Sequence, residues 1–484
     1  MEKKDILLIY PPYTYPKKSP PIGLAYVAAY LEREGYSVRI MDMAVTDVDD
    51  RALKSEIMRT APRLVGISFM TNQFREAVRI SNIVKEVDRN ITVAAGGPHV
   101  SALPGEILAL GQVDIAVIGE GEETMAEVMG VLLNSKSGGF GSIRGVAYKE
   151  DGKVNINAPR GPVRDPDSLP FPAWHMLPLD GYSVPCTGGD AAEHVYAVIS
   201  SRGCPNNCVF CDSHTVFGKR FRGRTARNIF DELLYLNRNF GASQFDFVDD
   251  TVTADKNRML ELCRLILEGG HRFKWMCNSR ANTVDPEMLG IMKKAGCVRI
   301  EFGVESGDER VLRLMKKGVT IEEIKDAHRF AHEAGLGVGS FVMVGNMGED
   351  IASVEKTNRL VRELETDDVY VSIATPFPGT ELYGIARRNG WLRTADWSEY
   401  VTAPTYFPGY SPVMKTDKMS GGEILKAFFY LHSQFAGKKF RTRYGRTFFL
   451  NGRFYRDNLS VRNYRELKHK ARLAKNLIGS YFQR

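Results

Sequence analysis

The chain has 484 residues, of which 43% are hydrophobic and 25% are charged. Such a chain is too long for one ordinary core and too apolar for wholesale disorder, so two or three folded domains are expected. The formal charge is +7, but Lys438–Arg484 contains 14 Lys and Arg residues and only two acids, which leaves the rest of the chain net negative. The basic character therefore belongs to the tail.

The first 155 residues alternate apolar strand patterns with helical patterns. Met1–Asp5 precedes a short apolar run and then prolines, which fits neither a signal peptide nor a membrane span, so a cytoplasmic location is expected. The expected strands are Asp5–Pro12, Ser37–Met43, Leu64–Met70, Ile91–His99 and Val113–Glu122. This alternation predicts a doubly wound, Rossmann-like α/β domain, which binds ligands at the carboxyl ends of its strands.

A proline- and glycine-rich passage, residues 156–194, is the predicted linker to a second alternating series in residues 195–400. The strands expected there are Val195–Arg202, Gln244–Asp250, Phe273–Arg280, Val298–Ser306, Gly337–Gly345 and Asp368–Gly379. Six strand–helix units predict a partial (β/α)6 barrel whose active site lies where the strands end. Residues 401–484 are predicted to be a small, basic, mainly helical C-terminal extension.

The segment Ser201–Asp212, "SRGCPNNCVFCD", gathers three of the seven cysteines, spaced C-x₃-C-x₂-C. One tight cluster and an odd cysteine count favour metal chemistry over a disulfide framework. Structural zinc usually takes four ligands, and here only His214 could complete a Cys₃His site. Three thiolates suit a [4Fe–4S] cluster that leaves one iron open to a non-protein ligand. The remaining cysteines are scattered singly, and three of them have apolar contexts typical of core residues: Cys263, Cys277 and Cys297.

The cysteine spacing, the strand before it and the aromatic Phe210 resemble the radical S-adenosylmethionine (SAM) superfamily, over Val195–Gly379. The resemblance implies that Cys204, Cys208 and Cys211 hold a [4Fe–4S] cluster whose fourth iron binds SAM. One electron, from a donor such as flavodoxin or ferredoxin, then cleaves SAM to a radical that abstracts hydrogen. The residues that would contact SAM by this resemblance are Asp249, Asp250, Arg280, Glu305, Ser306, Gly345 and Gly348.

Several of these SAM-side residues also have a purely structural interpretation. One of the two aspartates could cap a helix, and Glu305 could be a buried carboxylate bonded to backbone. The glycines Gly345 and Gly348 could serve ordinary turns.

Motifs at the strand ends of the first domain, in the order "PP", "GGPH" and "GEGE", resemble the cobalamin-binding radical SAM class. That class contains cobalamin-dependent methyltransferases and anaerobic Mg-protoporphyrin monomethyl ester cyclases. The residues expected beside cobalamin are Pro11, Pro12, Ser68, Gly96, Gly97, His99, Gly119, Glu120 and Gly121. The D-x-H-x-x-G motif that supplies a cobalt ligand is missing, so His99 is expected to pack near the corrin tail.

Other assignments of the first domain are disfavoured. The first cysteine is Cys186, which argues against the methylthiotransferases, because their N-terminal domain carries three further cysteines. A G-x-G-x-x-G dinucleotide loop is also missing after the first strand. A flavodoxin-like fold without a cofactor remains the alternative.

The expected reaction is hydrogen abstraction from an unactivated carbon of a small-molecule or lipid substrate, followed by methyl transfer from cobalamin. The alternatives are oxidative ring closure on a porphyrin and modification of an RNA or lipid without methyl transfer. The basic, aromatic tail could rest on an anionic membrane surface, contact phosphates, or be a solvated face. It matches no RNA-binding module, so nucleic acid is not favoured. A non-catalytic scaffold is disfavoured because the cluster and SAM-side motifs occur together.

Overall fold

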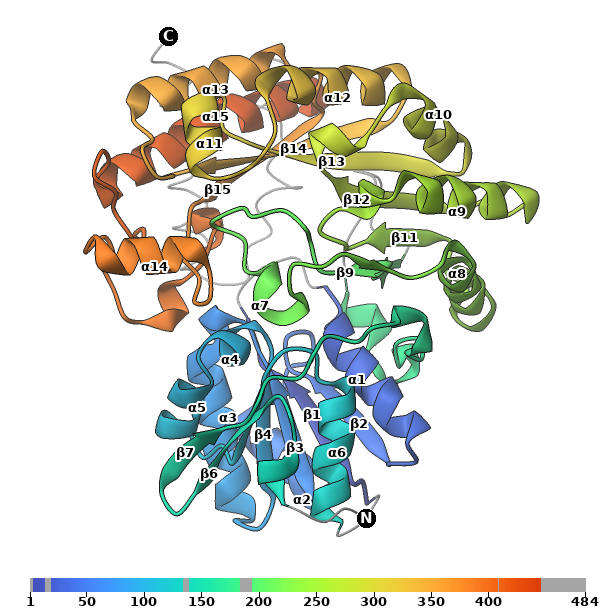
Figure 1. Ribbon diagram of the computed structural model, residues 1–484, viewed down its shortest axis with the longest axis vertical. Helices are drawn as coiled ribbons and strands as arrows, with labels where there is room; N and C mark the ends of the chain where they lie inside the picture. Colours follow the sequence, from blue (N-terminus) through green and yellow to red (C-terminus); the bar gives the residue numbers. More distant parts are fainter. Residues whose placement is uncertain (1–2, 14–18, 134–138, 183–193, 408, 445–484) are drawn as a thin grey trace.

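The computed structural model describes residues 3–13, 19–133, 139–182, 194–407 and 409–444. An N-terminal α/β domain lies below a barrel-like α/β domain in the view of Figure 1. Cys186 and most of the basic tail lie outside the described residues. Over the ranges given above, no helix is long and apolar enough to cross a membrane.

The N-terminal sheet contains, among the described residues, seven strands in the order β2-β1-β3-β4-β5-β6-β7. Strands β1 to β5 are parallel to one another: β1 (Ile6–Tyr10), β2 (Val38–Asp42), β3 (Leu64–Ser68), β4 (Thr92–Gly96) and β5 (Ile115–Val117). Its helices are α1 (Ile22–Arg33), α2 (Asp50–Thr60), α3 (Phe74–Val87), α4 (Pro98–Ala102), α5 (Pro104–Leu110) and α6 (Glu122–Leu132). One core packs α1 and α6 on one face of the sheet, and another packs α2, α3 and α5 on the opposite face. The predicted doubly wound fold is therefore confirmed.

An antiparallel hairpin, which the sequence analysis did not identify, extends this sheet at β5. It consists of β6 (Val146–Glu150) and β7 (Lys153–Ile156). The turn is Asp151-Gly152, and both residues have positive φ angles, 49° and 75°. Asp-Gly favours the two-residue turns that join antiparallel strands, so this dipeptide was the available signal.

The second sheet contains, in the described part of the chain, six parallel strands in the order β15-β14-β13-β12-β11-β8, so β15 and β8 are its edges. They are β8 (Val195–Val198), β11 (Gln244–Phe247), β12 (Lys274–Ser279), β13 (Cys297–Glu305), β14 (Gly337–Val344) and β15 (Asp368–Ile373). The intervening helices are α8 (Ala226–Phe240), α9 (Lys256–Glu268), α10 (Pro286–Lys294), α12 (Ile321–Glu333) and α13 (Ile351–Glu363). This open arrangement is the predicted partial barrel.

The barrel helices form where the sequence supplies both a cap and an apolar face. The side chains of Thr225, Asp255, Asp285, Thr320 and Asp350 each accept a backbone N–H at a helix start, which satisfies donors that the helix itself cannot pair. On the strands, alternate residues such as Phe245, Phe247 and Trp275 are buried toward the helices. The other residues of these strands consequently face the barrel interior.

Shorter elements complete the barrel domain. A small ribbon pairs β9 (Ser201–Arg202) with β10 (Arg222–Gly223). The other elements are α7 (Ser213–Phe217), α11 (Glu309–Leu314), α14 (Glu381–Arg388) and α15 (Gly421–Tyr444). Of these, α7 lies between the two domains in Figure 1.

Candidate functional site

The carboxyl ends of both parallel sheets point toward the junction of the two domains. The loops that follow the N-terminal strands contact β9 and α7, which follow the first barrel strand. Parallel α/β sheets bind ligands at this edge. Glu120, at the end of the loop after β5, and Arg202 of β9 therefore meet at this junction.

The cysteine loop begins directly after β9. Gly203 has a φ of +78°, and a Cβ atom there would lie 2.3 Å from the backbone oxygen of Arg220, so only glycine fits this turn. Cys204 is buried, whereas Cys208 and Cys211 are half-buried. Val209 N–H donates to Met315 O at 3.1 Å, which anchors the loop to the segment after α11.

Hydrogen-bond donors point at two of the three thiols. Asn206 Nδ2 lies 3.2 Å from Cys204 Sγ, and Arg280 Nη1 lies 3.6 Å from Cys208 Sγ. Donors near sulfur stabilise its charged form and tune the reduction potential of an iron–sulfur cluster. Burial raises the pKa of the Cys211 thiol to about 12, so a bound metal is needed to hold it as a thiolate.

Three cysteines on one loop, with His214 bonded to backbone, fit an iron–sulfur cluster better than a zinc ion. Within the described residues, no group of three or more His, Cys, Asp or Glu side chains is placed to hold a single metal ion. His214 Nε2 lies 2.9 Å from Cys204 O and is therefore engaged with backbone. In a [4Fe–4S] cluster each thiolate binds a different iron, so three cysteines on one loop fit that group.

Arg280, Glu305 and Phe210 are brought together through Lys317, a residue that the sequence analysis did not select. Arg280 Nη2 donates to Lys317 O. Lys317 Nζ lies 2.8 Å from Glu305 Oε1 and 5.9 Å from the centroid of the Phe210 ring. The Lys317 side chain is only 7% exposed. Its charge thus pairs with Glu305, whose backbone has an unusual positive φ of 61°.

The two aspartates after β11 have different surroundings. Asp249 is buried and accepts from Ser200 N and Ser200 Oγ at 3.0 and 2.9 Å and from Ser201 Oγ, so it holds the end of β8 in place. Asp250 accepts from Ser213 Oγ on α7, beside the cysteine loop. Burial raises the pKa of Asp250. Of the two, Asp250 is the better placed to meet a ligand.

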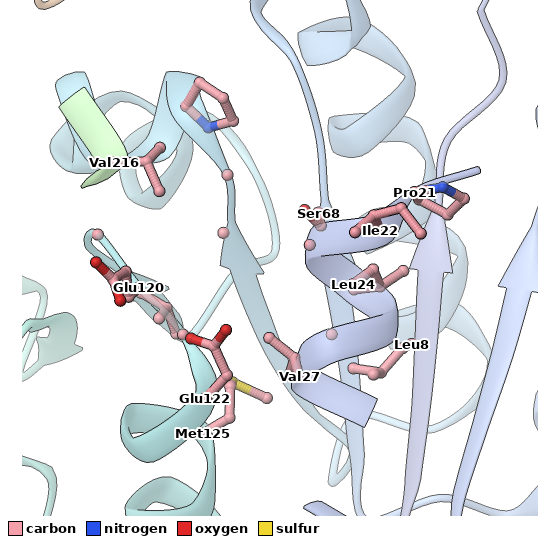
Figure 2. A pocket seen from close by; sticks show the side chains of 18 of the residues that line it. Leu8, Pro21, Ile22, Leu24, Val27, Ser68, Glu120, Glu122, Met125 and Val216 are labelled. Atoms are coloured by element: carbon pink, nitrogen blue, oxygen red, sulfur yellow. The ribbon is translucent and has the colours of Figure 1, made fainter. Parts of the chain in front are cut away.

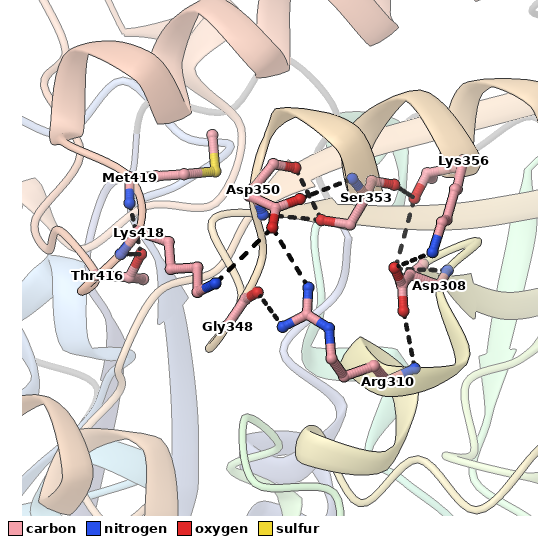
Figure 3. A network of polar contacts seen from close by, with 11 residues as sticks. Asp308, Arg310, Gly348, Asp350, Ser353, Lys356, Thr416, Lys418 and Met419 are labelled. Carbon is pink, nitrogen blue, oxygen red and sulfur yellow. Dashed lines mark hydrogen bonds and ion pairs between the residues drawn. The ribbon is translucent and has the colours of Figure 1, made fainter.

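The loops after β13 and β14 are joined by the network in Figure 3. Arg310 Nη1 donates to Gly348 O at 2.6 Å, and Arg310 Nη2 lies 3.5 Å from Asp350. Asp308 caps α11 and pairs with Lys356 at 2.8 Å. The network therefore fixes the backbone of Gly348 relative to the loop that carries Ser306.

The Gly345 turn and the Ser306 side chain are held by the protein itself. Gly345 N–H donates to Glu349 Oε2 at 2.5 Å, and burial raises the pKa of Glu349 to about 7. Ser306 is fully buried, and its hydroxyl accepts from Asp308 N–H at 3.2 Å. The Gly345 N–H and the Ser306 hydroxyl are thus both engaged within the protein.

A cavity of about 280 Å³ lies at the carboxyl edge of the N-terminal sheet, between α1 and α6 (Figure 2). The side chains of Leu8, Val27 and Met125 form part of its apolar wall, and Val216 and Phe217 of α7 close it on the barrel side. Several sequence-predicted residues border it: Ser68, Gly96, Gly97, Gly119, Glu120 and Gly121. Apolar pockets with a few polar groups are typical ligand sites.

Glycine at position 66 keeps this cavity open. A Cβ atom on Gly66 would lie 2.7 Å from Leu8 Cδ2 and 3.7 Å from Met125 Cε. The absence of a side chain at this position of β3 leaves room for a flat group between the helices and the sheet. An apolar cavity that an added side chain at this position would narrow fits the nucleotide tail of a cobalamin.

His99, Pro11 and Pro12 do not border the cavity. His99 is fully buried against Phe69, Phe74 and Trp397, with ring centroids 4.9–5.8 Å apart. Burial lowers the pKa of His99 to about 4, so its ring is neutral at pH 7. Pro11 follows β1, and its carbonyl oxygen accepts from Gln73 Nε2 at 2.7 Å.

The carboxylates of the "GEGE" motif pair with arginines of the barrel domain. Arg202 reaches Glu120 at 2.9 Å and Glu122 at 2.6 Å, and Arg222 reaches Glu120 at 2.5 Å. All four side chains are 5% exposed or less. The sequence analysis missed both arginines, although Arg202 directly precedes the cysteine loop. Glu120 thus joins the domains as well as bordering the cavity.

Comparisons with known protein families agree with this division of the chain. Residues 198–361 match the Radical SAM superfamily, and residues 14–129 match the B12 binding domain.

Curated relatives match along most of their length. An uncharacterized methyltransferase of Pyrococcus horikoshii is 35% identical, over 88% of this chain and 91% of that protein. The cytidylyl-2-hydroxyethylphosphonate methyltransferase of Streptomyces wedmorensis is 28% identical, over 84% and 85%. The anaerobic magnesium-protoporphyrin IX monomethyl ester cyclase of Rubrivivax gelatinosus is 26% identical, over 84% and 72%.

Solved structures share the fold at low sequence identity. The radical SAM methyltransferase TsrM from Kitasatospora setae, with cobalamin and a [4Fe-4S] cluster bound, is 18% identical with a TM-score of 0.68, over 81% of this chain and 76% of that chain. The cobalamin-dependent radical SAM enzyme OxsB is 16% identical with a TM-score of 0.75, over 99% and 72%.

Proposed function

The chain belongs to the radical SAM enzymes that carry a B12-binding domain, and on this premise we propose that it methylates a carbon atom of a small-molecule substrate held at the domain junction. Its cofactors are a [4Fe–4S] cluster, SAM and cobalamin. When bound, these groups supply a one-electron cleavage of SAM and a transferable methyl group.

One observation carries the proposal. The loop that holds the cysteines and the cavity of the B12-binding domain share a wall. Arg202 lines the cavity and directly precedes Gly203 and Cys204, while Val216 and Phe217 of α7 follow the same loop and line the cavity too. A substrate between the two sites would therefore lie within reach of both, which methyl transfer to a substrate carbon requires.

The chain's own residues bind and orient the reactants. The three cysteines hold the cluster, and Asn206 and Arg280 donate toward two of the sulfurs. Arg310 and Lys356 hold the loops after β13 and β14 at fixed positions beside the site. Apolar side chains of α7 and α1 keep water from the corrin-binding side, which protects a reactive intermediate.

Glycine 66 provides a test that separates methyl transfer from SAM cleavage. Gly66→Val should narrow the cavity and displace the Leu8 side chain, so the corrin content should fall about tenfold or more after reconstitution with hydroxocobalamin. Cleavage of SAM to 5′-deoxyadenosine should continue, whereas transfer of the labelled methyl of SAM to protein-bound corrin should be lost. Corrin absorbance and radioactivity measure the two effects.

Gly105→Val is the matched control, because a Cβ atom there meets nothing within 4 Å. It should retain corrin and label transfer. If Gly66→Val bound corrin and transferred label like the wild type, the cavity would not be the corrin site. Substrate-dependent formation of 5′-deoxyadenosine without S-adenosylhomocysteine would instead favour oxidative ring closure over methylation.

A further inference from the structure

A second pocket, of about 680 Å³, lies between the two domains and shares no lining residue with the cavity between α1 and α6. The B12-binding domain contributes Glu106 and Ala109 of α5. The barrel domain contributes α14 and the chain after it, on the same side of the molecule as α5 in Figure 1. Three of the barrel-side residues are aromatic: Tyr383, Trp397 and Tyr400. The function proposed above does not use this pocket.

The aromatic side chains form inclined walls around Trp397. Its ring centroid lies 6.1 Å from that of Tyr383 and 4.8 Å from that of Tyr400, with the ring planes inclined by 45° and 56°. Trp397 and Tyr383 are half-buried, so part of each side chain is open to the pocket. Tyr400 is fully buried, and its hydroxyl donates to Thr394 O at 3.3 Å. Inclined rings of this kind can contact one ligand from several sides.

Glu106 brings a negative charge to this pocket. Its Oε2 accepts from Trp397 Nε1 at 2.7 Å, which holds the carboxylate at the edge of the indole. Among the residues that the structure describes, the one basic group within ion-pair distance of Glu106 is His99, whose Nε2 lies 3.8 Å away. Burial lowers the pKa of His99 to about 4, so this ring is neutral at pH 7. The carboxylate, 39% exposed, is therefore uncompensated by any described cation.

Arg393 also lines the pocket, but other contacts hold its guanidinium group. Its Nη1 donates to Ser411 Oγ at 2.8 Å and to Pro412 O at 3.1 Å. A Cβ atom on Gly421 would lie 3.0 Å from its Cζ and 3.4 Å from its Nε, so the group lies against the start of α15. The charge beside the aromatic rings is thus that of Glu106.

The two tyrosines respond to this charge. Burial, together with the negative charge of Glu106, raises the pKa of Tyr383 and that of Tyr400. Both hydroxyls therefore stay protonated at pH 7, and the aromatic walls carry no charge of their own. A neutral aromatic enclosure with one carboxylate favours a cation over an anion.

We propose that this pocket binds a small organic cation that carries a quaternary ammonium group. The negative face of an aromatic ring attracts a cation, and the carboxylate adds a charge partner. A quaternary ammonium group presents apolar methyl groups to the rings and has no N–H that they would leave unpaired. Because both domains supply lining residues, the bound cation would also stabilise their junction. This inference does not depend on the proposed methylation.

The experiment measures the binding of choline to the reconstituted full-length chain by calorimetry at constant ionic strength. The neutral isostere dimethylbutanol, in which a carbon atom replaces the charged nitrogen, separates the effect of charge from that of shape. The wild type should bind choline at least about tenfold more tightly than dimethylbutanol. Saturating choline should also raise the midpoint of thermal unfolding, because a ligand of the folded state stabilises that state.

Glu106→Gln keeps the shape of the side chain and can still accept from Trp397, but it removes the charge. It should weaken choline binding about tenfold and leave dimethylbutanol binding unchanged. Glu399→Gln is the matched control, because Glu399 is exposed on the same short helix as Trp397, Trp397–Glu399, and does not line the pocket. It should bind choline like the wild type.

Tyr383 provides a second pair of variants, which distinguishes the ring from its hydroxyl. Tyr383→Phe retains the aromatic face and should keep its affinity for choline, whereas Tyr383→Leu should lose about threefold to tenfold. Iron content after reconstitution should be the same in all of these variants, because none of the changed residues belongs to the cysteine loop.

Equal affinities of the wild type for choline and dimethylbutanol would overturn the proposal, as would full choline affinity in Glu106→Gln. A trimethyllysine peptide that bound more tightly than choline, and lost this affinity in Glu106→Gln, would assign the pocket to a protein partner and overturn the small-molecule ligand. Displacement of choline by SAM at equal concentration would assign the pocket to a sulfonium compound and overturn the ammonium ligand.

Discussion

Cys208→Ala is expected to reduce the rate of SAM cleavage more than about a hundredfold, because the cluster loses one of its three protein ligands. Removing even an outer contact of a metal ligand commonly costs ten- to a hundredfold. Arg280 would also lose the sulfur toward which it points at 3.6 Å. Iron and sulfide content after anaerobic reconstitution, together with 5′-deoxyadenosine formation, measure the loss.

Cys263→Ala is the matched control for this substitution. Cys263 is fully buried on α9, away from the cysteine loop, and contacts Met259. The control should keep its iron and its activity and lose only a modest amount of stability. A Cys208→Ala protein with normal iron content and SAM cleavage would contradict the assignment of the cluster.

Glu120→Ala is expected to destabilise the junction of the two domains by about 3–5 kcal/mol, because it leaves Arg222 buried without a carboxylate and leaves Arg202 with Glu122 alone. Arg202 and Arg222 both bond to this carboxylate, and Arg222 also donates to Val163 O at 2.6 Å. Removal of one member of a buried ion pair costs far more than removal of an exposed one. Denaturant titration followed by tryptophan fluorescence measures the first unfolding transition.

Glu123→Ala, three residues further along the chain on α6, provides the comparison. Glu123 is 46% exposed and pairs with Arg160 at 3.0 Å, so its loss should cost within about 1 kcal/mol. Glu120→Gln keeps the shape and should give an intermediate cost. Equal denaturation midpoints for Glu120→Ala and Glu123→Ala would show that the buried ion pairs of Glu120 do not hold the domains together.

The architecture was largely predictable because it depends on local patterns. Strands of the parallel sheets are buried on both faces and therefore read as apolar runs, such as Ile6–Tyr10, and the helices between them carry capping residues. The β6–β7 hairpin was missed because both strands are short and β7, at the sheet edge, is mostly exposed. Its Asp-Gly turn was the only local signal.

Site residues that lie close together in the sequence could be predicted. Contacts between residues that are far apart in the sequence could not. The three cysteines are apparent from eight residues of sequence. Arg202 and Glu120 are 82 residues apart, and nothing in either local segment indicates their contact. Lys317 likewise follows another lysine in an ordinary helix end, and only the fold brings it to Glu305. The role of a glycine such as Gly66 can be inferred only when its neighbours in the folded structure are known.

The most direct test of the central claim, that one chain brings an iron–sulfur cluster and a corrin to a single junction, is quantitation of both in the same sample. The chain would be reconstituted anaerobically with iron, sulfide and hydroxocobalamin and then analysed for iron, sulfide and corrin per polypeptide. About four irons, four sulfides and one corrin are expected. A cluster without corrin would contradict the role of the first domain, and zinc in place of iron would contradict the whole account.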